Sequence, residues 1–196
     1  MSITPSIVQK GFNQTSTWDL ETELFNTKRE IFIDKEIDEN LAISIIKQIK
    51  CLSSESNDPI NLIISSPGGD VDYGFAIIDE IEKCKFDVNA LAVGRVASMA
   101  ALIFAACKKR MMNKHSRILI HNPYLSSGAK GTLENVKQQA EHLNSIQDLQ
   151  AEILAKACNQ PKEKIMEICD KDQFMSATEA YEIGLCNHII GGNKNA

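Results

Sequence analysis

Short apolar runs alternate with amphipathic stretches along most of the chain, and the alternation is regular from residue 30 onward. Each run has the length and the β-branched or apolar content of a buried strand rather than of a helix. The pattern predicts strands at residues 30–33, 60–64, 88–93, 118–120 and 186–190.

The stretches between these runs carry apolar residues at helical spacing. After residue 38, for example, Leu41, Ile45 and Ile49 fall on one helix face, and Asp38 stands where an N-cap is expected. The same pattern predicts further helices at residues 19–25, 75–81, 98–106 and 132–157, one opened by Pro161, and a short one between a Ser176/Glu179 capping box and Gly184.

Continuous apolar strands separated by crossover helices predict an α/β fold with a largely parallel sheet that is buried on both faces. The chain contains no internal repeat and no linker of the kind that separates domains, so residues 19–190 are predicted to form one domain. Residues 1–18 are polar with little period and are predicted to be a flexible N-terminal arm. Residues 191–196 are predicted to be a loose tail.

Composition narrows the classes of function. Of the 196 residues, 43% are hydrophobic and 24% are charged, the net charge is −5, and no dense basic tract is present, which argues against nucleic-acid binding. The six cysteines form no metal-binding pattern and are expected to be buried free thiols in a reducing compartment. Because no stretch approaches the ~20 apolar residues of a membrane span, we expect a cytoplasmic protein with no membrane contact and no metal.

Three predicted strands end in residues that could carry chemistry, as expected of sites in open α/β sheets. Gly68 and Gly69 follow the second strand and allow a backbone N–H to approach a ligand closely. Ser98 begins a helix among small residues, where its hydroxyl and the Met99 amide lie at the positive helix end. His121 ends the fourth strand. A serine that an imidazole activates is the chemistry this set would support.

Each of these residues also has an ordinary structural interpretation. A serine such as Ser98 is most often an N-cap, and a single histidine at a strand end is usually structural. An activated serine further needs a carboxylate that orients the imidazole. Asp170 and Asp172 are both candidates, and spacing alone leaves the choice between them open.

Four motifs in this order, Ser-Pro-Gly-Gly, Ala-Ser-Met, Ile-His-x-Pro and Asp-x-Phe-Met-Ser-Ala-x-Glu-Ala, resemble the signature of the ClpP family. This family contains the proteolytic subunit of the ATP-dependent Clp protease, and the resemblance covers roughly residues 18–190. It implies a ClpP/crotonase-type fold with a protruding long helix, the handle. It also implies a serine-type endopeptidase.

The resemblance further implies a role for individual residues. Ser98 would be the nucleophile, His121 the general base and acid, and Asp172 rather than Asp170 the orienting carboxylate. The backbone amides of Gly68 and Met99 would form the oxyanion hole. Substrate-binding residues would be Gly69, Leu125, Ser126 and Ser127.

The partners are likewise implied by the resemblance. We expect copies of the chain to assemble into stacked heptameric rings, a tetradecamer, and an AAA+ unfoldase of the Clp type to deliver unfolded polypeptides for protein quality control. The unfoldase consumes the ATP, so no cofactor is expected in this chain. Alternatives are a phage-type capsid-maturation protease of the same fold, a non-catalytic ring subunit, and a crotonase-like acyl-CoA enzyme, which would hold a thioester enolate with paired glycine amides.

Overall fold

The computed structural model describes residues 5–10, 15–125 and 128–191. The helices in these residues are α1 (Leu20–Lys28), α2 (Glu39–Glu55), α3 (Val71–Lys83), α4 (Met99–Ala106), α5 (Leu133–Cys158), α6 (Lys162–Cys169) and α7 (Ala177–Glu182). The strands are β1 (Ser6–Lys10), β2 (Thr15–Asp19), β3 (Glu30–Ile33), β4 (Ile60–Ile64), β5 (Val88–Ala92), β6 (Arg95–Ala97), β7 (Arg110–Asn113), β8 (Arg117–Leu119), β9 (Met175–Ser176) and β10 (His188–Ile190).

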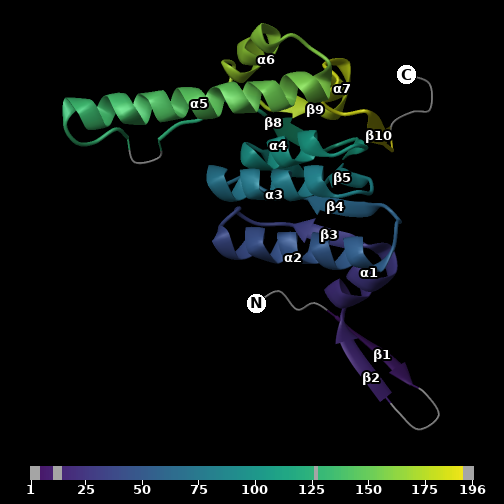
Figure 1. Cartoon of the computed structure of the whole chain (residues 1–196). Helices are drawn as coiled ribbons and strands as arrows, with labels where there is room; N and C mark the ends of the chain where they lie inside the picture. Colours follow the sequence, from purple (N-terminus) through teal and green to yellow (C-terminus); the bar gives the residue numbers. More distant parts are fainter. Residues whose placement is uncertain (1–4, 11–14, 126–127, 192–196) are drawn as a thin grey trace.

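The central sheet has the strand order β10-β7-β5-β4-β3, and every neighbouring pair in it is parallel. Helices α2, α3, α4 and α5 pack one against the next in chain order, so they form a row beside this sheet (Figure 1). The inward residues of β3 and β4 are fully buried beneath them. The predicted α/β architecture with a mainly parallel sheet is therefore confirmed.

A second, smaller sheet has the order β6-β8-β9 and is mixed, with β6 parallel and β9 antiparallel to β8. The sequence pattern placed the apolar run at residues 118–120 in the central sheet, and this assignment was wrong. The run shows that the segment is buried, but only the tertiary pairing decides which sheet it joins. This second sheet carries the segments before Ser98 and His121, so it positions the candidate chemistry.

Local signals gave several element ends correctly. The Asp38 side chain accepts a hydrogen bond from the Leu41 N–H at 2.8 Å and caps α2. The Ser176 hydroxyl and the Glu179 carboxylate form the predicted capping box at the start of α7. Both caps satisfy N–H groups that have no partner within their own helix.

Two strands lie in the N-terminal segment, residues 1–18, which was predicted to be a flexible arm. Its described residues contain β1 and β2, which pair antiparallel with Ile7 opposite Trp18. Valine, isoleucine and threonine favour extended backbone even where the polar pattern shows no clean alternation. Of the predicted tail, residues 192–196 lie outside the described residues.

Helix α5 extends well beyond the rest of the fold (Figure 1). Its buried residues all fall between Gln150 and Cys158, whereas Leu133 at its start is 73% exposed. The C-terminal third of α5 therefore belongs to the core, and the remainder projects from it.

The cysteines are free thiols, as expected, and Cys107, Cys158, Cys169 and Cys186 are buried. Burial raises the pKa of Cys107 to about 12 and the pKa values of Cys158 and Cys169 to about 11, so these thiols remain protonated at neutral pH. In the part of the chain that the structure describes, no helix has the length and apolar character of a membrane span. Within the same residues, no group of three or more His, Cys, Asp or Glu side chains could hold a metal ion.

The Arg110 side chain ties together the ends of several elements. Its guanidinium donates hydrogen bonds to four backbone carbonyls at 2.8 to 3.2 Å, namely those of Cys107, Ala157, Gly184 and Leu185. These carbonyls follow or end α4, α5 and α7. The planar fork of arginine suits this arrangement, and a single ammonium group cannot reach all four oxygens.

We therefore expect Arg110→Lys to lower the free energy of unfolding by about 2–4 kcal/mol, because several carbonyl groups lose a charged donor. For a chain of this size that loss corresponds to a fall in Tm of roughly 5–10 °C, measurable by circular dichroism. The control is Arg117→Lys, the same change at an exposed side chain. Equal Tm values for the two variants would show that the four bonds add little stability.

Candidate active site

Ser98 occupies the N-cap position of α4 but does not act as a cap. Its backbone has φ 56° and ψ −128°, and its side chain makes no capping hydrogen bond. A non-glycine residue in this region costs about 1–3 kcal/mol and is found mostly at functional sites. The Ser98 N–H donates to the Leu119 carbonyl at 2.9 Å, which ties this turn to β8. The hydroxyl is thus held at the start of α4, where it does not stabilise the helix end.

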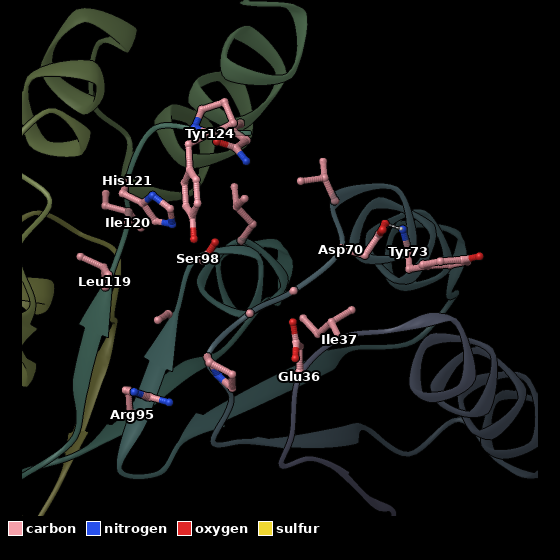
Figure 2. A pocket seen from close by; sticks show the side chains of 18 of the residues that line it. Glu36, Ile37, Asp70, Tyr73, Arg95, Ser98, Leu119, Ile120, His121 and Tyr124 are labelled. Carbon is pink, nitrogen blue, oxygen red and sulfur yellow. Dashed lines mark hydrogen bonds between the residues drawn. The ribbon is translucent and has the colours of Figure 1, made fainter. Parts of the chain in front are cut away.

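A cavity of about 950 Å³ opens beside Ser98. Its lining includes all three residues predicted as a catalytic triad, Ser98, His121 and Asp172, although they are far apart in sequence. Figure 2 shows Ser98, His121 and Tyr124 close to one another, with Asp70 and Tyr73 farther along the cavity. The fold therefore brings Ser98, His121 and Asp172 to the lining of one cavity.

The imidazole of His121 contacts the ring of Tyr124. The two ring centroids are 5.6 Å apart and the rings are tilted by 43°. Within residues 5–10, 15–125 and 128–191, no hydrogen bond joins Ser98 to His121 or His121 to Asp172. Catalytic hydrogen bonds are often long or absent in the free enzyme and form only with bound substrate.

The two candidate aspartates, Asp170 and Asp172, have different surroundings in the structure. Asp170 accepts a hydrogen bond from the Asn122 amide at 2.6 Å, and the Asn122 oxygen accepts one from Gln147 of α5 at 2.9 Å. Asp170 is thereby engaged in a structural network that joins α5 to the segment after His121. Asp172 has a left-handed backbone with φ 47° and, unlike Asp170, lines the cavity. Of the two aspartates, only Asp172 belongs to the lining of the cavity that Ser98 and His121 also line.

The backbone at Gly68 lies directly against the start of α4. A Cβ atom added to Gly68 would come within 2.7 Å of the Ser98 Cβ and 2.9 Å of the Met99 nitrogen, and Gly68 has a positive φ of 94°. Only glycine permits this approach. The Gly68 N–H, however, donates to the Ser66 hydroxyl at 3.1 Å. The two predicted oxyanion-hole residues are neighbours, but one of their amides is directed at Ser66 in this structure.

The predicted substrate-binding residues have different positions. Gly69 lines the cavity and pairs with Ile37 in an isolated parallel bridge. Leu125 is half-buried and does not line the cavity. Ser126 and Ser127 lie outside the described residues.

The motifs did not reveal several residues of the cavity wall. Tyr124, Glu36 and Gln150 line the cavity, and so does the exposed Arg95 of β6. Tyr124 could have been suspected because it stands three residues after His121. Gln150 precedes Leu154 by one helical turn and is therefore a polar residue on the buried face of α5. Glu36 carries no local signal, because only the bridge between Ile37 and Gly69 brings its loop to the site.

A serine at a strained strand-to-helix turn, beside a cavity that a histidine and an aspartate also line, is compatible with the chemistry of a serine hydrolase. Comparison with known families gives the particular class. The family model described as Clp protease matches residues 13–193. The chain belongs to the Clp protease family, which makes it a peptidase of the serine type.

Proposed function

We propose that the protein is a serine endopeptidase in which Ser98, His121 and Asp172 form the catalytic triad. The observation that carries the proposal is the free hydroxyl of Ser98, held in a strained turn at the start of α4 and facing the cavity that His121 and Asp172 also line. A hydroxyl that fulfilled only a structural role would be expected to make the capping bond, and this one does not.

In this mechanism the Ser98 hydroxyl attacks the carbonyl carbon of the scissile peptide bond while His121 takes its proton. The same imidazole then gives that proton to the leaving amine, and Asp172 orients the imidazole and stabilises its cationic form. These steps need two hydrogen bonds of His121, to Ser98 and to Asp172, and neither is made within the residues that the structure describes. Substrate binding or assembly of subunits would provide the energy for that alignment.

The negative oxygen of the tetrahedral intermediate would be stabilised by backbone N–H groups. The Met99 N–H is suitable because it is the first amide of α4 and has no acceptor within the helix. The Gly68 N–H can join it by exchanging the Ser66 hydroxyl for the developing oxyanion, since the two amides lie on adjoining backbone.

The family relationship extends the proposal to assembly. Copies of this chain would form stacked heptameric rings around a closed chamber, and a Clp-type AAA+ unfoldase would deliver unfolded polypeptides to it in the cytoplasm. The projecting part of α5 would serve as the handle between rings, which would account for exposed apolar side chains such as Leu133 and Leu149. Contact with a second ring would also affect the hydrogen bonds that link Gln147, through Asn122, to Asp170. Asp170 lies two residues before Asp172 in the chain.

A fluorophosphonate reagent tests the proposed chemistry, because it reacts with serines that a neighbouring base activates. We expect the native chain to be labelled on Ser98 alone, as mapped by peptide mass spectrometry, and to hydrolyse short fluorogenic peptides. Heat-denatured protein is the control and should take up no label. A native chain that resists the reagent and hydrolyses no peptide would contradict the assignment, and a crotonase-like activity would leave Ser98 unlabelled.

A further inference from the structure

The side chain of Gln150 is buried beside the active-site cavity. Only 9% of the residue is exposed, and it belongs to the cavity lining. Its side chain makes no hydrogen bond to any residue in the described ranges 5–10, 15–125 and 128–191. Gln147, one turn earlier on the same helix, does have a partner, because its amide donates to Asn122. Gln150 is therefore a mostly buried residue of the cavity lining, and its amide has no partner among these residues and keeps some contact with solvent.

The surroundings of Gln150 are apolar and close to the nucleophile. Leu154 follows it by one turn of α5, Leu102 follows Ser98 by one turn of α4, and the two helices pack together. Both leucines line the cavity and are almost completely buried, at 2% and 4% exposure. The wall beside Ser98 is thus an aliphatic surface with one neutral amide in it.

We infer that Gln150 determines which substrate side chain is accepted next to the scissile bond, and that it favours asparagine and glutamine over leucine. This inference rests on the proposed function. In this proposal the substrate residue whose carbonyl carbon Ser98 attacks places its side chain along the part of the cavity lining that contains Leu102 and Leu154. A substrate side chain that ends in a neutral amide can both donate a hydrogen bond to the Gln150 amide and accept one from it.

The preference follows from desolvation. In the free enzyme, water in the cavity can hydrate the Gln150 amide. A leucine side chain would displace that water and leave the amide without a partner, and this loss offsets the gain from burying the leucine. A side chain with its own amide replaces the lost bonds. Sites that contain a buried hydrogen-bonding group discriminate strongly against substrates that cannot pair with it.

The test uses the full-length protein and fluorogenic peptides that differ only in the residue before the scissile bond, with glutamine, asparagine, leucine or glutamate at that position. We expect the wild-type kcat/KM to be higher for glutamine than for leucine. Gln150→Leu should lower the glutamine-to-leucine ratio about 10-fold, mostly by raising kcat/KM for leucine. Gln150→Met retains the length of the side chain without its polar atoms and should act in the same direction.

Gln138→Leu is the matched control, because it makes the same change on an exposed position of α5, and it should leave the ratio unchanged. A ratio that stays at the wild-type value in both Gln150 variants would overturn the inference while the proposed peptidase remained valid. A wild-type chain that hydrolyses none of the peptides would instead overturn the proposed function, and the inference with it.

Discussion

Replacing Ser98 by alanine is expected to lower the rate of peptide hydrolysis by roughly 10⁵-fold or more, because the attacking oxygen is removed. The fold should be unaffected. An N-cap serine normally stabilises its helix by about 1 kcal/mol, but the Ser98 side chain makes no capping bond, so that contribution is absent here. Rates with a fluorogenic peptide, together with Tm and sedimentation of the same samples, would measure both effects.

Ser54→Ala is the control for this experiment, because it removes a hydroxyl from an exposed position of α2, away from the proposed contact between rings. It should change neither rate nor Tm measurably. A Ser98→Ala variant that still hydrolysed the peptide at near wild-type rate would remove Ser98 from the mechanism. If the variant lost activity and also failed to sediment as the wild type does, the loss could come from assembly. Ser98→Cys, which retains a nucleophile and nearly the same side-chain size, would then be compared for sedimentation and for peptide hydrolysis.

Much of the fold could be predicted because its signals are local. The strands at residues 30–33 and 60–64 are continuous apolar runs, and their observed bounds match the predicted ones. The start of α2 and that of α7 depend on a side chain three residues from the group it caps. Periodicity and caps of this kind need no knowledge of tertiary contacts.

Strands that depend on distant partners were missed. Strand β7 begins at Arg110 in a run of basic residues that resembles a solvated loop. It becomes a strand because β5 and β10 pair with it on either side and because the Arg110 side chain is held by carbonyls from three helix ends. Strand β6 is only three residues long and pairs with β8, which the apolar pattern alone would place in the central sheet.

Sequence motifs predicted the proposed reactive groups of the site but not the residues of the cavity wall. Ser98, His121 and Asp172 stand in recognisable local patterns, and the fold does bring them to one cavity. The hydrogen bond that occupies Asp170 links positions 48 residues apart and leaves no trace in the sequence. The same holds for Gln150, whose burial depends on the packing of α5 against α4.

The second large effect on turnover is expected from a substitution of Asp172, which lines the cavity, and not of Asp170, which does not. Asp172→Asn should lower turnover by roughly 10⁴-fold, by analogy with other Ser-His-Asp triads, because an amide in place of the carboxylate favours the wrong tautomer of His121. Asp170→Asn should lower it less than about 10-fold. Its new amide oxygen can still accept the hydrogen bond from Asn122, so the network that reaches Gln147 is retained.

Both variants would be compared by kcat/KM on one fluorogenic peptide, with Tm measured on the same preparations. Asp170→Asn is itself the matched control, since it makes the same chemical change two residues away and outside the cavity lining. If Asp170→Asn proved the more damaging variant at unchanged Tm, the orienting carboxylate would be Asp170. The bond from Asn122 to Asp170 would then have to break during the catalytic cycle, and Asn122→Ala, which frees Asp170, should raise turnover rather than lower it.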